Sequence, residues 1–219
     1  MKKTFLLSCL MLAAMPVMAA YTGHVYVDKN KNGVFDQSEK PLAGIKVSDG
    51  LNVVETAADG SFTLPGHERE RFIFITTPSG YKTFNRHYHK IEKKQSGYDF
   101  GLIPYSGRIR KDGSHRYIHI TDTEIFNTEN HADWVNNVHD YARNEQAAFI
   151  IHTGDLCYEK GLKAHIKLMN TENMDCPVFY CIGNHDLVKG KYGEELFESI
   201  YGPVYYSFDA GNVHYVVTP

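Results

Sequence analysis

Two hydrophobic patterns divide the chain near residue 105. Before it, apolar and β-branched residues come in short runs, separated by turn residues such as Asn-Gly, Asp-Gly and Pro-Gly. Runs of this kind predict strands. The predicted strands are His24–Val27, Ile45–Val47, Val53–Thr56, Ser61–Leu64, Phe72–Thr76 and Tyr98–Ile103. We therefore expect residues 22–105 to form an all-β domain, an antiparallel sandwich.

Two segments of the first 115 residues are polar. Lys82–Lys94 is the most basic stretch of the chain, and we interpret it as a solvated loop. The alternative is that it attracts a phosphorylated substrate toward the second half. Gly107–His115 contains no apolar period and is interpreted as a linker.

From Tyr117 onward the pattern changes to strands that alternate with helices. Strands are predicted at Tyr117–Thr121, Phe149–Thr153 and Val178–Ile182. Helical apolar faces are predicted from Trp134, Val138 and Tyr141 (with Val135 and Ala142 beside them) and from Leu162, Ile166 and Met169. The alternation predicts parallel βαβ units, whose right-handed crossovers bring the strand ends to one edge of a sheet. A hairpin pattern follows, with strands at Tyr205–Asp209 and Val213–Val217.

Each predicted parallel strand ends in an acid or an amide. Asp122 follows the first strand, Gly154-Asp155 the second and Gly183-Asn184-His185-Asp186 the third. Oxygen ligands gathered at one sheet edge predict a site for two divalent ions. A carboxylate on the middle strand can bridge ions about 3.5–4 Å apart, so Asp155 is the expected bridge. Asp122 would then hold one ion and the amide oxygen of Asn184 the other.

The residues after Asn184 add acid–base chemistry to this site. His185, beside the second ion, is placed to donate a proton to a leaving oxygen, and Asp186 to orient that histidine. Two cations would lower the pKa of a shared water and polarise a phosphoryl group. We interpret His119 and His152 as packing residues, and His214 as a core or rim residue, not as ligands.

These ordered motifs resemble those of the calcineurin-like metallophosphoesterases. The resemblance implies a dinuclear centre of Mn, Mg, Fe or Zn ions with Asp122, Asp155 and Asn184 as ligands and His185 as the catalytic acid. It also implies a fold of two β-sheets between helices, an α/β/β/α sandwich, for residues 116–219. Together with the small β domain, the chain is similar to exported phosphoesterases of Bacteroides-type bacteria.

The chain departs from the family pattern at two places. Where the family usually has Asp-x-His, this chain has Asp122-Thr123-Glu124, and a Glu124 carboxylate would favour a hard ion such as Mg or Mn over Zn. The family's later lone His and Gly-His-x-His are not found after Asn184. We therefore expect an incomplete α/β/β/α sandwich, the N-terminal half of the domain, in a C-terminally truncated chain.

A candidate calcium loop lies in the first half of the chain. Its expected oxygen ligands have the spacing of a calcium loop, with Gly33 at the turn; they are Asp28, Asn30, Asn32, Asp36 and Glu39. A strand precedes it instead of a helix, so it resembles the loop of Cna-B- and SdrD-type immunoglobulin-like repeats. The resemblance implies an immunoglobulin-like sandwich and a structural calcium ion. A polar surface turn that binds nothing is the alternative.

The first 20 residues resemble a secretory signal peptide. Lys2 and Lys3 precede the apolar stretch Phe5–Ala14, and small residues follow it. This stretch is too short to cross a bilayer, which takes about 20 apolar residues, so we expect a periplasmic or secreted protein without a membrane span. The formal net charge is −3 and the basic residues are scattered, which argues against nucleic-acid binding.

The sequence thus predicts an exported metal-dependent phosphoesterase that hydrolyses phosphate mono- or diesters with a dinuclear-metal-activated water. The alternative is a non-catalytic, calcium-stabilised surface binding module with a degraded or truncated phosphoesterase half. A carbohydrate-binding role would depend on exposed aromatic residues such as Tyr81, Tyr88 and Tyr98. The substrate, the oligomeric state and the disulfide pairing of Cys157, Cys176 and Cys181 are open at this point.

Overall fold

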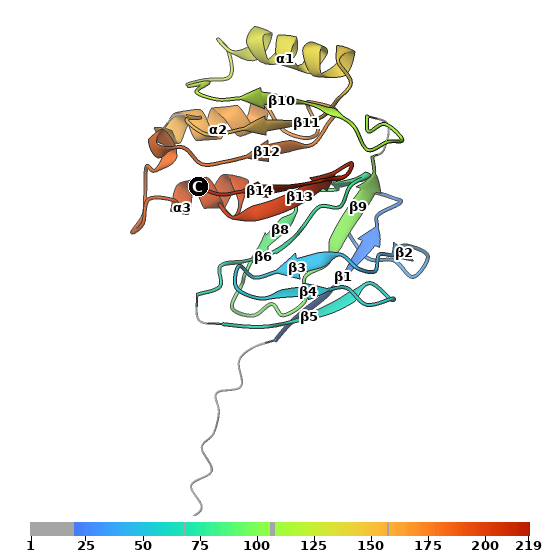
Figure 1. The fold of residues 1–219 in the computed structure, drawn as a ribbon. Helices are drawn as coiled ribbons and strands as arrows, with labels where there is room; N and C mark the ends of the chain where they lie inside the picture. The colour runs from blue at the N-terminus through green and yellow to red at the C-terminus, as the bar shows by residue number, and fades with distance from the viewer. Residues whose placement is uncertain (1–19, 68, 106–107, 157) are drawn as a thin grey trace, which may run out of the picture.

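The computed structural model describes residues 20–219, apart from residues 68, 106–107 and 157 (Figure 1). The predicted signal peptide and Cys157 therefore lie outside the described residues. Strands dominate the first half of the described chain, and strands with helices the second (Figure 1).

Two sheets make up the N-terminal half. The first has five strands, with β2, β1, β9 and β7 in that order and β5 paired to β1, and the second has four in the order β4-β3-β6-β8. The strands of the first sheet are β1 (Ala20–Val27), β2 (Lys40–Pro41), β5 (Ser61–Pro65), β7 (Tyr81–Thr83) and β9 (Phe100–Pro104). Those of the second are β3 (Lys46–Ser48), β4 (Val53–Glu55), β6 (Phe72–Ile75) and β8 (Tyr88–Lys90). All six predicted strands are confirmed.

The two sheets share one hydrophobic core. Val25 of β1 and Leu102 of β9 are buried in the same cluster as Val47 of β3 and Ile73 of β6. Along β5 alternate residues are buried, and both of these, Phe62 and Leu64, belong to this cluster. The expectation of purely antiparallel pairing is wrong at one place, because β1 and β9 run parallel.

The basic stretch Lys82–Lys94 is not simply a solvated loop. Its first residues belong to β7, and β8 lies within it, paired with β6. The Tyr88 ring is buried and packs edge-to-face on Phe72, with 5.6 Å between ring centroids. Tyr98 is buried as well, so two of the three aromatic residues that would support carbohydrate binding are core residues.

The second half contains the predicted parallel sheet. The strands β10 (Arg116–Ile120), β11 (Ala147–His152) and β12 (Val178–Tyr180) pair in parallel in that order. Helix α1 (Ala132–Asn144) connects the first two, and α2 (Tyr158–Leu168) the last two (Figure 1). Strand β11 is the central strand and is buried along nearly its whole length.

The predicted apolar face of α1 is partly wrong. Val135 and Ala142 are buried and Val138 is partly buried against the same core, whereas Trp134 and Tyr141 are 38% and 60% exposed. The buried positions follow an i, i+3, i+7 stripe, and the two aromatic residues lie on the flank next to it. On α2, Leu162 and the adjoining Met169 are fully buried, as predicted.

A hairpin joins the two halves of the molecule. It consists of β13 (Tyr206–Ala210) and β14 (Val213–Val217), as predicted, and follows a 3₁₀ turn at Asn184–Asp186 and helix α3 (Glu195–Tyr201). Phe208 of β13 stacks on Phe179 of β12 with 3.5 Å between centroids. The neighbouring Ser207 hydroxyl lies 2.9 Å from that of Thr76 in the N-terminal half. Strand β13 thus contacts both the parallel sheet and the first half.

Tyr206 covers the free edge of the parallel sheet. Its hydroxyl accepts a hydrogen bond from the backbone N–H of Tyr180 and donates one to the Tyr180 carbonyl, each at 2.8 Å. Among the described residues no strand pairs with β12 on this side, so the phenol satisfies the two backbone groups of Tyr180 that a neighbouring strand would satisfy. Burial raises the pKa of Tyr206.

An ion pair ties α3 to the N-terminal half. Arg71, just before β6, lies with Nη2 2.6 Å from Oε1 of the buried Glu198 on α3. The guanidinium also lies 4.7 Å from the Tyr192 ring centroid, and the Tyr192 hydroxyl donates to Glu198 at 2.8 Å. Both carboxylate oxygens of this buried acid are therefore paired, as a buried charge requires.

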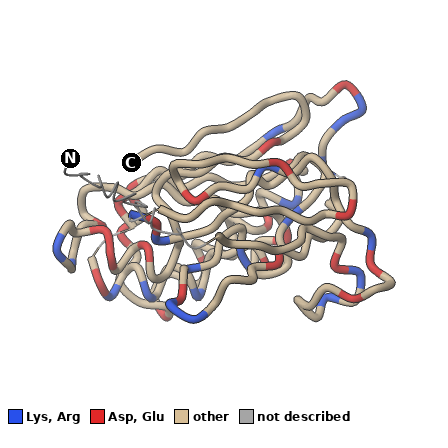
Figure 2. Tube along the Cα trace, turned by 90° about the horizontal axis from the view of Figure 1, so that it is seen from below, with Lys and Arg blue, Asp and Glu red and all other residues tan. Residues whose placement is uncertain are grey.

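Charge is mixed over the surface of the described chain. Figure 2 shows Lys and Arg positions interleaved with Asp and Glu positions along the trace, in agreement with the small net charge of −3. In the part of the chain that the structure describes, no helix is both long and apolar enough to span a bilayer.

His87 makes the contact between the two halves sensitive to acid. Its ring lies 4.5 Å from the Tyr206 ring, and burial lowers its pKa from 6.5 to about 4. The unfolded chain therefore binds a proton between pH 6.5 and 4 that the folded chain does not, and stability falls as the pH drops through this range. Between pH 7 and 4.5, we expect the Tm of wild type to fall about 5–10 °C further than that of His87→Phe, which keeps the ring contact. Equal losses in calorimetric scans of the two proteins would contradict this assignment.

Candidate metal centre

The residues predicted at the three strand ends lie together at one edge of the parallel sheet. Asp122 N–H donates to the Gly154 carbonyl at 3.1 Å, and Glu124 N–H to the Asp155 carbonyl at 3.4 Å. The backbone N–H of His185 donates to Oδ1 of Asp155 at 3.1 Å. The loop after β11 is thus hydrogen-bonded to the loops after β10 and β12, and Asp155 lies between them.

Two glycines allow this approach. A Cβ on Gly154 would lie 2.5 Å from the backbone N of Gly183, and a Cβ on Gly183 would lie 2.2 Å from the backbone N of Asp155. Gly154 also has a φ of +100°, which L side chains rarely adopt. The two loops are therefore in backbone contact, which a side chain at either position would prevent.

Backbone strain is concentrated here. Seven non-glycine residues of the described chain have positive φ, and four belong to these loops or follow them directly: Asp122, Glu124, Asp155 and Tyr158. A left-handed conformation costs such a residue about 1–3 kcal/mol and persists where the surrounding structure enforces it. Strain of this kind clusters at ligand sites.

His185 is held between an aromatic ring and a carboxylate. Its ring stacks on Tyr158 with 5.6 Å between centroids and 11° between planes. Its Nδ1 lies 3.6 Å from Oε1 of Glu124 and is shielded from solvent, without a hydrogen-bond partner among the described residues. The predicted proton donor and the predicted extra ligand are therefore neighbours.

Asp186 holds the turn that carries His185. It is fully buried, and its Oδ2 accepts a hydrogen bond from the Gly183 N–H at 2.9 Å. That contact fixes the backbone at both ends of Gly183–Asp186. A direct orienting contact of Asp186 with the His185 ring stays a prediction, as do the ligand roles of Asp122, Glu124, Asp155 and Asn184.

These residues fit hard divalent cations. The donor set consists of carboxylate oxygens and one amide oxygen, the ligands that Mg and Mn prefer. The backbone contact of the two glycines holds Asp155 between the loops that carry the other oxygen donors. A dinuclear centre divides its ligands between two ions, so the carboxylates need not all lie within reach of a single ion.

A tighter group of possible ligands lies in the N-terminal half. Asp49, His67 and Glu70 are, among the described residues, the one group of at least three His, Cys, Asp or Glu whose ligand atoms all lie within 4.8 Å of one another. Nδ1 of His67 accepts the Arg69 N–H at 3.2 Å, so in the neutral ring the proton is on Nε2, 3.4 Å from Asp49 Oδ1. With the hydrogen on Nε2, this nitrogen can donate to the Asp49 carboxylate but has no lone pair to offer a metal ion. A histidine–aspartate contact therefore fits this tautomer better than a metal site. Sequence reasoning missed the group, because no motif connects its members.

The other histidines and the cysteines are not among the predicted ligands. His214 is exposed at the rim, with Nδ1 2.6 Å from Oδ1 of Asp209. The sequence predicted a core or rim position for it. His119 is exposed and contacts the Thr153 hydroxyl at 2.7 Å, while His152 is fully buried. Cys176 and Cys181 are free thiols.

The residues of the predicted calcium loop also converge. Asp28 and Glu39 are 1% and 6% exposed, although both are acids. Asp28 accepts the N–H groups of Asn32 and Gly33, and the Asn30 and Asn32 amides both donate to Asp36 Oδ2. Burial, followed by the charges of Asp28 and Glu39, raises the pKa of the nearby Tyr26. The loop thus concentrates negative charge in a buried place, and calcium binding there stays a prediction.

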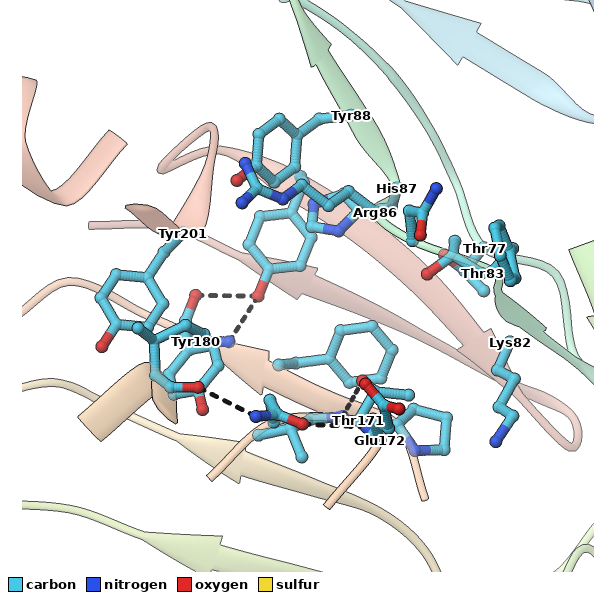
Figure 3. A pocket seen from close by; sticks show the side chains of 18 of the residues that line it. Thr77, Lys82, Thr83, Arg86, His87, Tyr88, Thr171, Glu172, Tyr180 and Tyr201 are labelled. Atoms are coloured by element: carbon cyan, nitrogen blue, oxygen red, sulfur yellow. Dashed lines mark hydrogen bonds between the residues drawn. The ribbon is translucent and has the colours of Figure 1, made fainter. Parts of the chain in front are cut away.

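A cavity of about 460 Å³ lies between the N-terminal half and the parallel sheet (Figure 3). Lys82 and Arg86 of the basic stretch line it, opposite Glu172, Tyr180 and Tyr201. None of the predicted metal ligands lines this cavity. It is therefore separate from the candidate metal centre.

Comparison with known families covers most of the chain. The family described as "N terminal of Calcineurin-like phosphoesterase" matches residues 29–104, and the family "Calcineurin-like phosphoesterase" matches residues 115–216. The chain belongs to the calcineurin-like metallophosphoesterases. This family consists generally of hydrolases that act on phosphoric esters and use divalent metals. A search of curated proteins gave no match.

The glycine contact gives a direct test of the candidate metal centre in this member of the family. Gly183→Ala should push the loop after β12 away from Asp155 and weaken Mn²⁺ binding by at least about tenfold, because ligand positions must be held within about 0.5 Å. Isothermal titration calorimetry with Mn²⁺ measures the change. Gly97→Ala is the matched control, because a Cβ there meets nothing within 4 Å. Equal Mn²⁺ affinities in the two variants would show that the close approach is not needed.

Proposed function

We propose that this chain hydrolyses phosphate mono- or diesters with the aid of two divalent cations. The observation that carries the proposal is the hydrogen-bonded junction of three strand-end loops, with Asp155 in the middle and Asp122 and His185 on either side. Family membership supports the same reaction class.

In this proposal each loop has a defined task. Asp122 and Glu124 would hold one cation, Asn184 the other, and Asp155 would bridge them. Two cations so bound lower the pKa of a shared water and polarise a phosphoryl group. The protein's part is to hold these oxygens at a fixed spacing and to exclude side chains from the space between the loops.

His185 would deliver a proton to the leaving oxygen. Tyr158 holds one face of the imidazole, and Oε1 of Glu124 lies 3.6 Å from Nδ1. Asp186 acts on this histidine through the turn at Gly183. A general acid in such a position contributes about 10²–10⁴-fold to the rate.

The proposal is tested by Asp155→Asn with bis-p-nitrophenyl phosphate and Mn²⁺. The substitution keeps the shape of the side chain but removes the charge that would bridge two cations. The rate should fall by more than about a hundredfold, beyond the 10–100-fold typical of groups that only support a ligand.

Asp140→Asn is the control for this experiment, because Asp140 is an exposed acid on α1. Its rate should equal that of wild type. Unchanged hydrolysis in Asp155→Asn would remove Asp155 from the mechanism. Absence of hydrolysis in the wild type with Mn, Mg, Fe or Zn would favour the non-catalytic surface module.

We also propose that the loop from Asp28 to Glu39 binds a structural calcium ion. The supporting observation is the burial of the two acids at its ends, Asp28 and Glu39, together with the Asp36 carboxylate between them. On this proposal the N-terminal half is an immunoglobulin-like support for the catalytic half, and the chain is exported after removal of residues 1–20. Export would expose the loop to the calcium concentrations found outside the cytoplasm.

Calcium should therefore stabilise the protein. At a concentration 100 times Kd, the expected gain is about 5–10 °C in Tm for a protein of this size. Glu39→Gln should remove most of that gain, and Glu55→Gln, an exposed acid on β4, should leave it intact. A Tm that does not respond to calcium, measured after chelation by EDTA, would show that the loop is a polar turn.

A further inference from the structure

His152 occupies a central position behind the candidate metal centre. It is the last residue of β11 and is fully buried, with its ring 5.0 Å from that of His165 on α2 and 6.3 Å from that of Tyr180. Among the described residues, no hydrogen bond joins it to a proposed ligand. Its two ring nitrogens instead contact the loops that carry those ligands.

Each nitrogen of His152 contacts a different loop. Nδ1 accepts a hydrogen bond from the backbone N–H of Gly154 at 3.2 Å, in the loop that carries Asp155. Nε2 lies 3.0 Å from the hydroxyl of Thr123, which stands between Asp122 and Glu124. One imidazole therefore connects the loop after β10 with the loop after β11.

The Gly154 contact decides where the proton is. A backbone N–H can only donate, so Nδ1 must present its lone pair. In a neutral imidazole the hydrogen is then on Nε2, which donates it to the Thr123 oxygen. A protonated ring would set an Nδ1–H against the Gly154 N–H and break this arrangement. In agreement with this, burial lowers the pKa of His152 from 6.5 to about 4.

We propose that His152 is a positioning residue that, through Gly154 and Thr123, sets the spacing between the carboxylates of Asp122, Glu124 and Asp155. The inference depends on the proposed function for its chemical consequence, because the spacing matters when those carboxylates share cations. Groups that hold metal ligands in place typically change metal affinity about 10–100-fold when they are removed.

Two substitutions separate the two contacts. The Asn side chain in His152→Asn places its amide near the Nδ1 position, so it can still accept from Gly154 but cannot reach Thr123. The Gln side chain in His152→Gln reaches further, so it can donate to Thr123 but does not accept from Gly154. Thr123→Val removes the hydroxyl at constant shape, and Thr123→Ser restores it.

The readout is Mn²⁺ binding by isothermal titration calorimetry on the full chain, with hydrolysis measured beside it. We expect His152→Asn, His152→Gln and Thr123→Val each to weaken Mn²⁺ binding about 10–100-fold, and Thr123→Ser to stay near wild type. The double variant His152→Asn/Thr123→Val should bind Mn²⁺ no more weakly than His152→Asn, because each of the two substitutions removes the same contact between residues 152 and 123. His139→Asn is the control, because this histidine of α1 pairs with Asp140 and Asp175 and with neither loop.

A second measurement does not depend on the reaction. Long-range ¹H–¹⁵N spectra of histidine-labelled protein report which ring nitrogen carries the proton, and we expect His152 as the Nε2–H tautomer at pH 7. An Nδ1–H tautomer would overturn the proposal. So would folded His152 variants with wild-type Mn²⁺ affinity. If the wild type neither bound Mn²⁺ nor hydrolysed the ester, the proposed function and the spacing role would both be rejected. The tautomer measurement would in that case still test the two hydrogen bonds of His152 by themselves.

Discussion

The backbone contact between Gly154 and Gly183 determines how the second half of this protein is arranged. The strands of a parallel sheet lie close to 4.8 Å apart, but the loops that follow them normally diverge. Here the loops after β11 and β12 stay in contact beyond the strands, because neither has a side chain at the point where they meet. Asp155 is then close enough to accept the His185 N–H. Strain in Asp122, Glu124 and Asp155 accompanies this packing.

The N-terminal half supports this arrangement through the hairpin and helix α3. Phe208 of β13 stacks on Phe179 of β12, and a bridge to Thr77 connects the same strand to the first half. Arg71 holds α3 through Glu198, and α3 is the next helix or strand after the turn that carries His185. Residues 29–104, which match the N-terminal region of the family, therefore stabilise the half that carries the candidate site.

The strand ends were predictable because apolar runs and polar endings are both local signals. Asp122, Asp155 and Asn184 could be placed at one edge from the βαβ pattern alone. Burial of a large side chain beside charged ones was not predictable in this way. Tyr88 lies among basic residues and is nevertheless a core residue of β8, whereas Trp134 and Tyr141 have the helical spacing of a core face and are exposed.

Contacts between distant residues were the least predictable part. The group of Asp49, His67 and Glu70 and the contact of His152 with Thr123 depend on how loops fold back on one another. His152 could be predicted to pack beside a strand, but its hydrogen-bond partners could not be, because Thr123 lies in another loop and its approach depends on the glycines.

The phenol of Tyr206 has a consequence for the behaviour of this protein in concentrated solution. An uncovered outer strand with free amide and carbonyl groups is a template on which a foreign chain can extend a sheet. By engaging both groups of Tyr180, a single hydroxyl ends the sheet at β12. The width of the sheet is thus limited by a side chain from the hairpin, and docking of that hairpin protects the folded protein against edge-to-edge self-association.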